Sequence, residues 1–260
     1  MGSADASSVL AISDLSVRFG GIVALNDVSF EVGRGQICGL IGPNGAGKTT
    51  LFNCLSRLYQ PDSGRITFDG HALLEEPRHR MAALGIGRTF QNLALFRSMS
   101  VRDNIMVGGH CTIGGGVLAN ALRLPLVGRE EARLAARTDA LLAALDLEAI
   151  ADAPVQGLTF GARKRVELAR ALACKPKLLL LDEPAGGLNS EEVEKLRALI
   201  LMVRERFDLT VLLVEHHMNL VMRVSDKVVA LDFGRKIADG TPEEVRNTPE
   251  VIRAYLGEAG

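Results

Sequence analysis

The sequence has few cysteines, and they are not placed for a metal site or a disulfide framework. Cys38, Cys54, Cys111 and Cys174 lie far apart, with no C-x-x-C pair and no histidine at metal-binding spacing. This arrangement excludes zinc-ribbon modules and small proteins held together by disulfides. We expect all four side chains to be reduced thiols in the core of a cytosolic protein.

The chain also lacks a long hydrophobic run and an excess of charge of either sign. No apolar run approaches the roughly 20 residues that span a bilayer, and the N-terminal segment MGSADASSVLAISDLS lacks the features of a secretory signal. The 30 Lys and Arg and 31 Asp and Glu give a net charge of -1, so no overall field attracts nucleic acid or anionic lipid. Any phosphate binding must therefore be local.

What the chain does contain is a pattern typical of an α/β protein. Residues 9–32 read as two or three antiparallel strands joined at Gly20-Gly21, because their apolar residues roughly alternate. Short continuous apolar runs, typical of strands covered on both faces in a parallel sheet, span residues 37–41, 177–182 and 210–215. Crossover helices are expected at residues 48–58 and 190–206.

The middle of the chain reads as a helical insertion. Residues 92–157 lose the strand pattern, and residues 128–150 form an amphipathic pattern rich in Ala and Leu. The preceding GGHCTIGGG is expected to be flexible. After it, a hairpin is predicted to turn near Phe233-Gly234, followed by two short helices within residues 241–257.

The segment GPNGAGKTT fits the phosphate-binding pattern G-x-x-x-x-G-K-[ST], directly after a predicted strand and before a predicted helix. Its glycines allow backbone N-H groups to converge on a phosphate, Lys48 would bridge the β- and γ-phosphates, and the Thr49 hydroxyl would ligate Mg²⁺. The alternative is a glycine-rich turn with a surface lysine. The expected nucleotide-binding residues are Gly42, Pro43, Asn44, Gly45, Ala46, Gly47, Lys48, Thr49 and Thr50.

A second acidic motif, LLLLDE, ends a buried strand in two adjacent carboxylates. Because side chains alternate along a strand, Asp182 and Glu183 are expected to project in opposite directions. Asp182 can then orient the Mg²⁺ shell while Glu183 polarises the attacking water. The alternative is a pair of solvated carboxylates. No N-K-x-D motif for guanine is present.

The segment LTFGA is followed by RKR, which places Arg163, Lys164 and Arg165 near the start of a predicted helix. Positive charge at that end opposes the helix dipole. Either these side chains reach into solvent, or an anion lies opposite the helix end.

Over essentially its full length the chain resembles the ATP-binding subunits of ABC transporters. The resemblance rests on the phosphate-binding loop, the LLLLDE strand and five further places in the same order. These are Phe19, Gln91 in GRTFQN, LTFGA at 158–162, GGLN at 186–189 and His216. This resemblance implies a P-loop NTPase fold of RecA type, with a mostly parallel sheet, an N-terminal antiparallel part and a helical insertion.

The resemblance also implies roles for single residues. Phe19 would stack on adenine, Gln91 would sense Mg²⁺ and water, and His216 would contact the γ-phosphate. Each has a plainer alternative: Phe19 as a core aromatic, Gln91 and Asn189 as loop polar groups, and either His216 or His217 as a surface imidazole. The implied Mg²⁺ ligands are Thr49, Gln91 and Asp182.

In the family resembled, two chains dimerise head to tail, and LTFGA of one contacts ATP held by the other. Thr159, Phe160 and Gly161 would make this contact, so the anion opposite the helix would be the partner's ATP. The segment departs from the common form L-S-G-G-Q by Thr159, Phe160 and Ala162. Ala162 removes one bond of a capping box, so we expect a looser contact, which glutamine at 162 would tighten.

The implied function is that of an ATPase motor of an importer for branched-chain amino acids, or for amides or urea. The implied partners are a second ATPase subunit, identical or similar, membrane-spanning permeases and, indirectly, a substrate-binding protein. The chain would sit on the cytoplasmic face of the inner membrane, with no nucleic-acid partner. A nucleotide-gated module without turnover is the alternative, whereas an ABC ATPase of ribosomes or DNA would need a second P-loop, a coiled coil or zinc cysteines.

The expected organisation is one ABC ATPase domain at 8–260. Its expected parts are a nucleotide-binding core at 8–91 and 158–240, a helical subdomain at 92–157 and a helical tail at 241–260.

Overall fold

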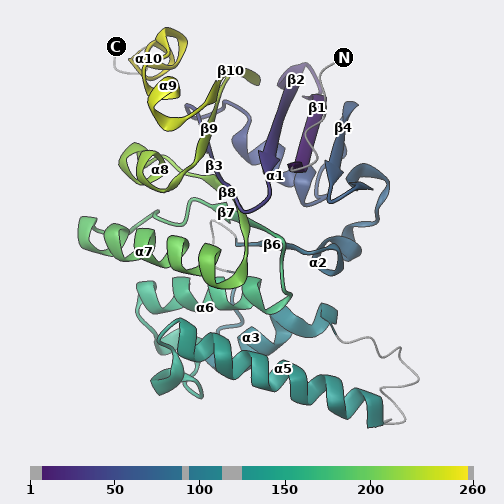
Figure 1. Cartoon of the computed structure of the whole chain (residues 1–260), viewed down its shortest axis with the longest axis vertical. Helices are drawn as coiled ribbons and strands as arrows, with labels where there is room; N and C mark the ends of the chain where they lie inside the picture. The colour runs from purple at the N-terminus through teal and green to yellow at the C-terminus, as the bar shows by residue number, and fades with distance from the viewer. Residues whose placement is uncertain (1–7, 90–93, 113–124, 257–260) are drawn as a thin grey trace. The chain divides into compact units, whose positions relative to one another are not determined.

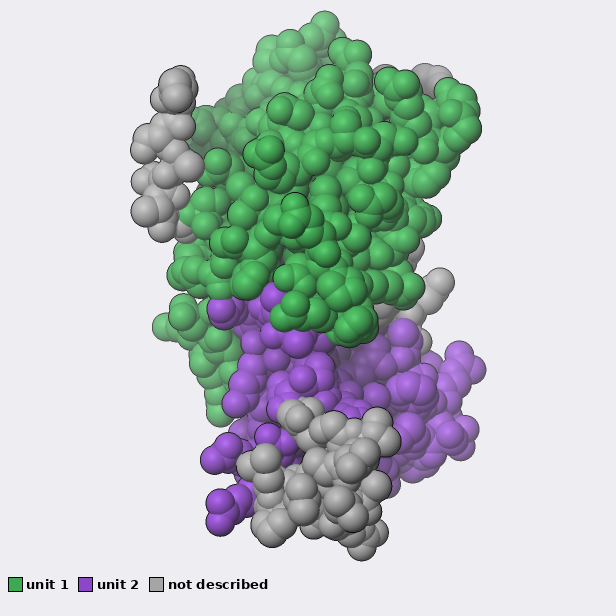
Figure 2. Space-filling view, turned by 90° about the vertical axis from the view of Figure 1, so that its right-hand side faces the viewer, with its two compact units in different colours: residues 1–81, 180–260 green, residues 82–179 purple. Residues whose placement is uncertain are grey.

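The computed structural model describes residues 8–89, 94–112 and 125–256 (Figure 1). The chain divides into two compact units, coloured separately in Figure 2. Unit 1 comprises residues 1–81 and 180–260, and unit 2 comprises residues 82–179. The division of the domain into the parts expected from the sequence stays a prediction.

Unit 1 contains a four-stranded antiparallel sheet in the order β2-β1-β4-β5. Its strands are β1 (Ser8–Phe19), β2 (Ile22–Gly33), β4 (Ser63–Phe68) and β5 (His71–Ala72). The β1-β2 hairpin at Gly20-Gly21 confirms the sequence prediction, and Gly20 has a φ of 59°, which glycine adopts without strain. β4 and β5 were not predicted from the sequence, although Ile66 and Phe68 of β4 are buried apolar residues.

The second sheet of unit 1 has the order β10-β9-β3-β8-β7. Its strands are β3 (Ile37–Ile41), β7 (Leu178–Asp182), whose first two residues belong to unit 2, β8 (Thr210–Val214), β9 (Lys227–Asp232) and β10 (Arg235–Gly240). β3 is parallel to both β8 and β9, whereas β9 and β10 form the predicted antiparallel hairpin. Every residue of β3, β7 and β8 is buried, as continuous apolar runs predict.

The helices that lie wholly in the described part of unit 1 are α1 (Lys48–Leu55), α7 (Ser190–Phe207), α8 (Met218–Val224), α9 (Pro242–Arg246) and α10 (Pro249–Leu256). α1 ends at Leu55 and not at Leu58 as expected, because Arg57 adopts a φ of 57°. α7 begins at a capping box in which Asn189 and Glu192 bond each other's backbone. The two short C-terminal helices confirm the prediction, and α9 starts at Thr241-Pro242.

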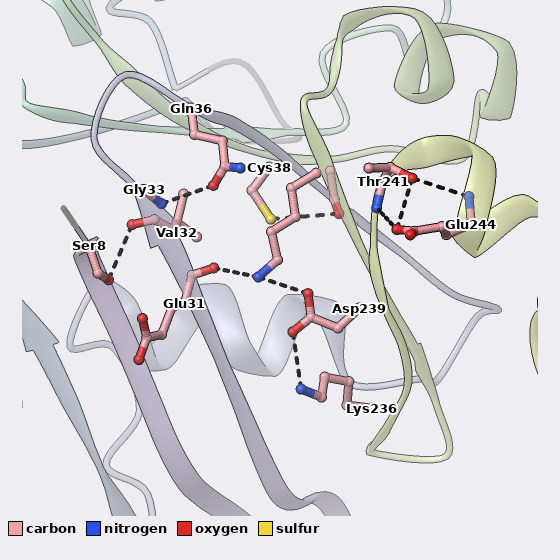
Figure 3. A network of polar contacts seen from close by, with 12 residues as sticks. Ser8, Glu31, Val32, Gly33, Gln36, Cys38, Lys236, Asp239, Thr241 and Glu244 are labelled. Carbon is pink, nitrogen blue, oxygen red and sulfur yellow. Dashed lines mark hydrogen bonds and ion pairs between the residues drawn. The ribbon is translucent and has the colours of Figure 1, made fainter. Parts of the chain in front are cut away.

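Polar contacts tie the C-terminal hairpin to β2 (Figure 3). The Lys227 ammonium donates to the Glu31 carbonyl at 2.9 Å and lies 2.8 Å from the Asp239 carboxylate. Lys236 contacts the other oxygen of Asp239 at 3.1 Å. Beside this network, burial raises the pKa of the Cys38 thiol to about 12. The contacts join strands that lie far apart in sequence.

Unit 2 is mainly helical. It contains β6 (Ile86–Arg88), α3 (Val101–Gly109), α5 (Pro125–Ala144) and α6 (Phe160–Ala173), while α2 (Met81–Leu84) stands at its first boundary. Within the described part of residues 94–157 there is no strand, as a helical insertion predicts. Short 3₁₀ turns of unit 2 span His110–Thr112, Glu148–Ile150 and Val155–Gly157, and those of unit 1 span Leu73–Glu75 and Arg78–Arg80.

Two expectations for this insertion are wrong. Gly108 and Gly109 belong to α3 and not to a flexible segment. A Cβ on Gly108 would lie 2.2 Å from the Arg170 carbonyl oxygen, and one on Gly109 would lie 2.2 Å from the Leu134 side chain. Both glycines therefore allow close helix packing. Cys111 is exposed, whereas the other three cysteines are buried. Residues 113–116 of the glycine-rich segment lie outside the described residues.

In the part of the chain that the structure describes, no helix combines the length and the apolar character that a membrane span requires.

Candidate functional site

Three of the sequence motifs meet at one edge of the second sheet of unit 1. β3 and β8 are parallel, with Leu40 beside Val214, so the segments that follow these strands leave the sheet at the same edge. The Glu183 N-H donates to the Val214 carbonyl at 2.9 Å, which brings the segment after β7 to this edge as well. The phosphate-binding loop, Glu183 and His216 are thus positioned by neighbouring strands.

The loop between β3 and α1 depends on glycine for its shape. Gly42 and Gly47 have φ angles of 152° and 100°, a region that disfavours other residues. A Cβ on Gly42 would lie 2.2 Å from the Leu231 carbonyl oxygen, and one on Gly47 would lie 2.5 Å from that of Ala24. The glycines therefore permit both the turn and its close packing on β9 and β2.

Lys48 is buried, with 5% of its surface exposed, so the alternative of a surface lysine is wrong. Its ammonium donates to the carbonyls of Gly42 at 2.6 Å and Pro43 at 2.8 Å, across its own loop. Lys48 also opens α1, and the N-terminal end of a helix favours an anion through its dipole. This arrangement suits the binding of a phosphate chain.

Glu183 and His216 contact each other directly. The His216 Nε2 lies 2.6 Å from the Glu183 Oε1, and the sequence did not predict this contact. It also favours His216 over His217 as the histidine of the site. Asp182 is buried and Glu183 is half-buried, so the alternative of two solvated carboxylates does not hold for Asp182.

The backbone of Glu183 differs from the sequence expectation. β7 ends at Asp182, and Glu183 has a φ of 48°, so side-chain alternation along a strand does not apply to it. A non-glycine residue in this left-handed region costs about 1–3 kcal/mol and persists only where its neighbours hold it. Such strain is found preferentially at functional sites.

Glu215 was expected only as the last residue of a strand, with no role in the site. The structure ends β8 at Val214 and buries the Glu215 carboxylate, which is 1% exposed. This carboxylate accepts hydrogen bonds from the backbone N-H of Ala185, His216 and His217. The sequence feature that could have indicated this buried carboxylate is a charged residue directly after the continuous apolar run of β8.

Phe19 is 46% exposed, so the alternative of a core aromatic is wrong. Its ring meets the ring of Tyr59 edge to face, with centroids 5.2 Å apart. The exposed ring remains available for stacking on a base, which stays a prediction.

The LTFGA segment begins α6 in unit 2. The Thr159 hydroxyl accepts the Ala162 N-H at 3.3 Å and so caps the helix, as predicted. Ala162 is 7% exposed, so a glutamine there would have to displace its neighbours. Gly161 follows Phe160 in the first turn.

The basic residues of α6 find partners within unit 2. The Arg163 guanidinium and the Lys164 ammonium lie 6.0 Å and 5.3 Å from the centroid of the Phe160 ring, and Arg165 donates to the Leu145 carbonyl at 3.2 Å. These contacts stabilise charges that oppose the helix dipole without requiring an external anion.

The residues present fit Mg²⁺ bound mainly through phosphate and water. Thr49 is exposed at the start of α1, and Asp182 ends β7. Among the described residues, no group of three or more His, Cys, Asp or Glu could hold a metal by itself. Mg²⁺ commonly uses one or two carboxylates plus substrate phosphates, so this set is sufficient. Gln91 lies outside the described residues.

The proteins that this chain resembles are ATP-binding proteins, in line with the phosphate-binding loop described above. Residues 25–186 match the ABC transporter family, and residues 235–260 match the family described as branched-chain amino acid ATP-binding cassette transporter. The chain is 43% identical over 251 residues to the high-affinity branched-chain amino acid transport ATP-binding protein BraF of Pseudomonas aeruginosa, covering 96% of this chain and 98% of that protein. The similarly named LivG of Escherichia coli K12 is 41% identical with the same coverage.

Solved structures share the fold. An ATP-binding cassette of an ABC transporter in its ADP conformation superposes with a TM-score of 0.83 and 28% identity, covering 96% of this chain and 99% of that one. A nucleotide-free ATP-binding cassette gives a TM-score of 0.82 at 28% identity, covering 95% and 98%. The chain belongs to the ABC transporter family, as a subunit that binds and hydrolyses ATP.

Proposed function

We propose that this chain hydrolyses ATP to drive import of branched-chain amino acids through membrane-spanning partners. Two observations support this substrate class: the 43% identity to the Pseudomonas protein and the match of residues 235–260. An amide or urea importer is the alternative. The chain itself would supply the motor.

The observation that carries the motor function is the 2.6 Å contact between Glu183 and His216. In this proposal Lys48 and the loop N-H groups bind the β- and γ-phosphates, and Phe19 stacks on adenine. Glu183 accepts a proton from the water that attacks the γ-phosphorus, while His216 orients the carboxylate and approaches the γ-phosphate. The bond from the γ-phosphorus to the bridging oxygen breaks, and ADP and phosphate leave.

Mg²⁺ would be held by the Thr49 hydroxyl, with Asp182 and Gln91 in its shell, and would neutralise charge on the phosphates. Thr49 stands at the start of α1 and Asp182 at the end of β7, both within unit 1. Both residues stand next to segments that meet at the sheet edge of the phosphate-binding loop, which supports this assignment.

Two such subunits would close over ATP. Thr159, Phe160 and Gly161 of one subunit would contact the nucleotide held by the other, and the capped N-terminus of α6 would face its phosphates. The second subunit would be a similar chain or a second copy. The pair would dock on permeases at the cytoplasmic face of the membrane, and a substrate-binding protein would act through them.

Turnover is tested by replacing the proposed base. Glu183→Gln should reduce phosphate release by at least about 100-fold, because the amide cannot accept the proton, while ATP affinity stays near that of the unchanged protein. Phosphate release and binding of a labelled ATP are measured on the same preparations. Equal rates for both proteins would instead support a nucleotide-gated module without turnover.

The substrate class is tested in proteoliposomes that contain the chain with its permeases and binding protein. Uptake of labelled leucine should require ATP inside and should be absent with Glu183→Gln. Excess isoleucine or valine should compete, and excess urea should not. ATP-dependent uptake of urea without uptake of leucine would contradict the branched-chain assignment.

A further inference from the structure

A buried carboxylate outside the predicted set of site residues links two segments of the site. The Glu215 Oε2 accepts the N-H groups of His216 at 3.0 Å and His217 at 3.3 Å, and the Oε1 accepts the N-H of Ala185. A buried charge is tolerated where hydrogen bonds compensate it, and here three backbone donors do so. Both oxygens are therefore occupied by donors.

The donors belong to the two segments that carry the proposed chemistry. Ala185 lies two residues after Glu183, and its segment turns back on itself through the bond from the Gly186 N-H to the Glu183 carbonyl at 3.2 Å. His216 follows Glu215 directly. One carboxylate thus fixes the backbone after β7 to the backbone after β8.

This tie matters because Glu183 occupies a strained conformation. Its left-handed φ of 48° must be held by the surrounding bonds, and its side chain must meet an imidazole from the next strand at 2.6 Å. A second tie between the segments is the Glu183 N-H bond to the Val214 carbonyl at 2.9 Å. A loosening of either segment would therefore misalign the pair.

We propose that Glu215 is a positioning residue for ATP hydrolysis: it aligns Glu183 with His216 by holding both loop backbones, without touching the nucleotide. The inference rests on the proposed function, in which Glu183 is the base. It also explains why a charged side chain is buried directly after an apolar strand.

The test is the isosteric change Glu215→Gln. In either orientation the amide turns its NH₂ toward a backbone donor, so one of the two loops loses its acceptor. We expect kcat for ATP to fall by about tenfold or more, because a misplacement near 1 Å costs up to about 100-fold. The KM for ATP and the affinity for labelled ATP should stay within about twofold, because the Lys48 loop is not involved.

A matched control separates positioning from stability. Asp226 also accepts a backbone N-H, that of Ile37 at 2.8 Å, but at the opposite edge of the same sheet. Asp226→Asn should leave kcat near that of the unchanged protein. Thermal midpoints are measured for every variant. Should Glu215→Gln not fold, Glu215→Asp retains the charge but is too short to reach both loops, and the same selective fall in kcat is expected.

Coupling to His216 gives the sharper test. In a His216→Ala background, Glu215→Gln should lower the residual kcat by less than about twofold, since the alignment it supports is already lost. Full additivity of the two losses in the double variant would overturn the inference. So would an unchanged kcat in Glu215→Gln, or equal losses of kcat and ATP affinity in that variant. If Glu183→Gln stops turnover while Glu215→Gln does not, the ATPase function stands and only the positioning role fails.

Discussion

At the scale of single residues, the phosphate-binding loop shows how backbone geometry limits which side chains a site tolerates. Gly42 and Gly47 combine positive φ angles with carbonyl oxygens closer than any Cβ could accept. By contrast, a Cβ on Gly128 in α5 would meet no atom of the described residues within 4 Å outside its chain neighbours and the backbone of its own helix. Glycine is thus required at the loop and dispensable in the helix.

Replacement of Gly47 should therefore impair both folding and nucleotide binding. Gly47→Ala places a Cβ 2.5 Å from the Ala24 carbonyl at a φ of 100°, so we expect a loss of about 1–3 kcal/mol in the free energy of unfolding. ATP affinity should fall as the loop shifts. Denaturant titration and equilibrium binding measure the two effects.

Gly128→Ala is the control for this change, since alanine favours an open helical position. It should leave both the free energy of unfolding and the ATP affinity equal to or higher than those of the unchanged protein. Equal stability of Gly47→Ala and the unchanged protein would contradict the steric argument.

At the scale of the elements, side-chain caps define where helices begin. Ser100, Thr159, Asn189 and Thr241 each accept a backbone N-H in the first turn of α3, α6, α7 and α9. The caps of α7 and α9 are complete capping boxes, whereas Ala162 leaves α6 with only one of the two bonds. The helix proposed to face ATP therefore has a simpler cap than α7 and α9.

The cap of α9 predicts a pH dependence of stability. The Thr241 N-H and hydroxyl donate to the Glu244 carboxylate at 2.8 Å and 2.9 Å, and these bonds hold its pKa below the ordinary value of 4.5. A folded-state pKa below the unfolded one stabilises the protein above pH 4.5, and this contribution is lost as pH falls through the folded value.

The thermal midpoint should accordingly fall more steeply below pH 4.5 in the unchanged protein than in Glu244→Gln, which has no titrating group at that cap. Glu243→Gln is the control, because Glu243 lies in the same turn outside the capping box. It should retain the steep fall. Parallel pH profiles for the unchanged protein and Glu244→Gln would refute the role of the cap.

At the scale of the whole molecule, the proposed motor requires a second subunit. The Thr159 hydroxyl both caps α6 and would face the partner's γ-phosphate. In hydrolysis-blocked Glu183→Gln protein, Thr159→Ala should weaken ATP-dependent association, and Thr159→Ser should preserve it. Loss of the helix cap by itself should lower the free energy of unfolding of Thr159→Ala by about 1 kcal/mol.

Sedimentation velocity with and without ATP measures this association. If ATP induces equal dimerisation of the Ala and Ser variants, the hydroxyl has no role at the subunit contact. If neither dimerises, with or without the membrane partners, the proposed subunit arrangement fails.

Much of the fold follows from local sequence. The continuous apolar runs of β3, β7 and β8, the hairpin at Gly20-Gly21 and the capped starts of α6 and α9 all depend on residues close together in the chain. β4 and β5 were missed because residues 63–72 are short strands interrupted by turn residues. Gly108 was misread as a sign of flexibility because the Arg170 carbonyl that requires it belongs to a distant helix.

The phosphate-binding loop, the acidic strand end and the family are recognisable without a structure, because each depends on contiguous residues whose chemistry does not require the rest of the chain. Three features became visible only in the folded chain: Glu183 leaves its strand, His216 meets it at 2.6 Å, and Glu215 accepts hydrogen bonds from both loops. These features arise where neighbouring strands bring residues 30 or more positions apart to one edge of the sheet, and no local pattern encodes that pairing.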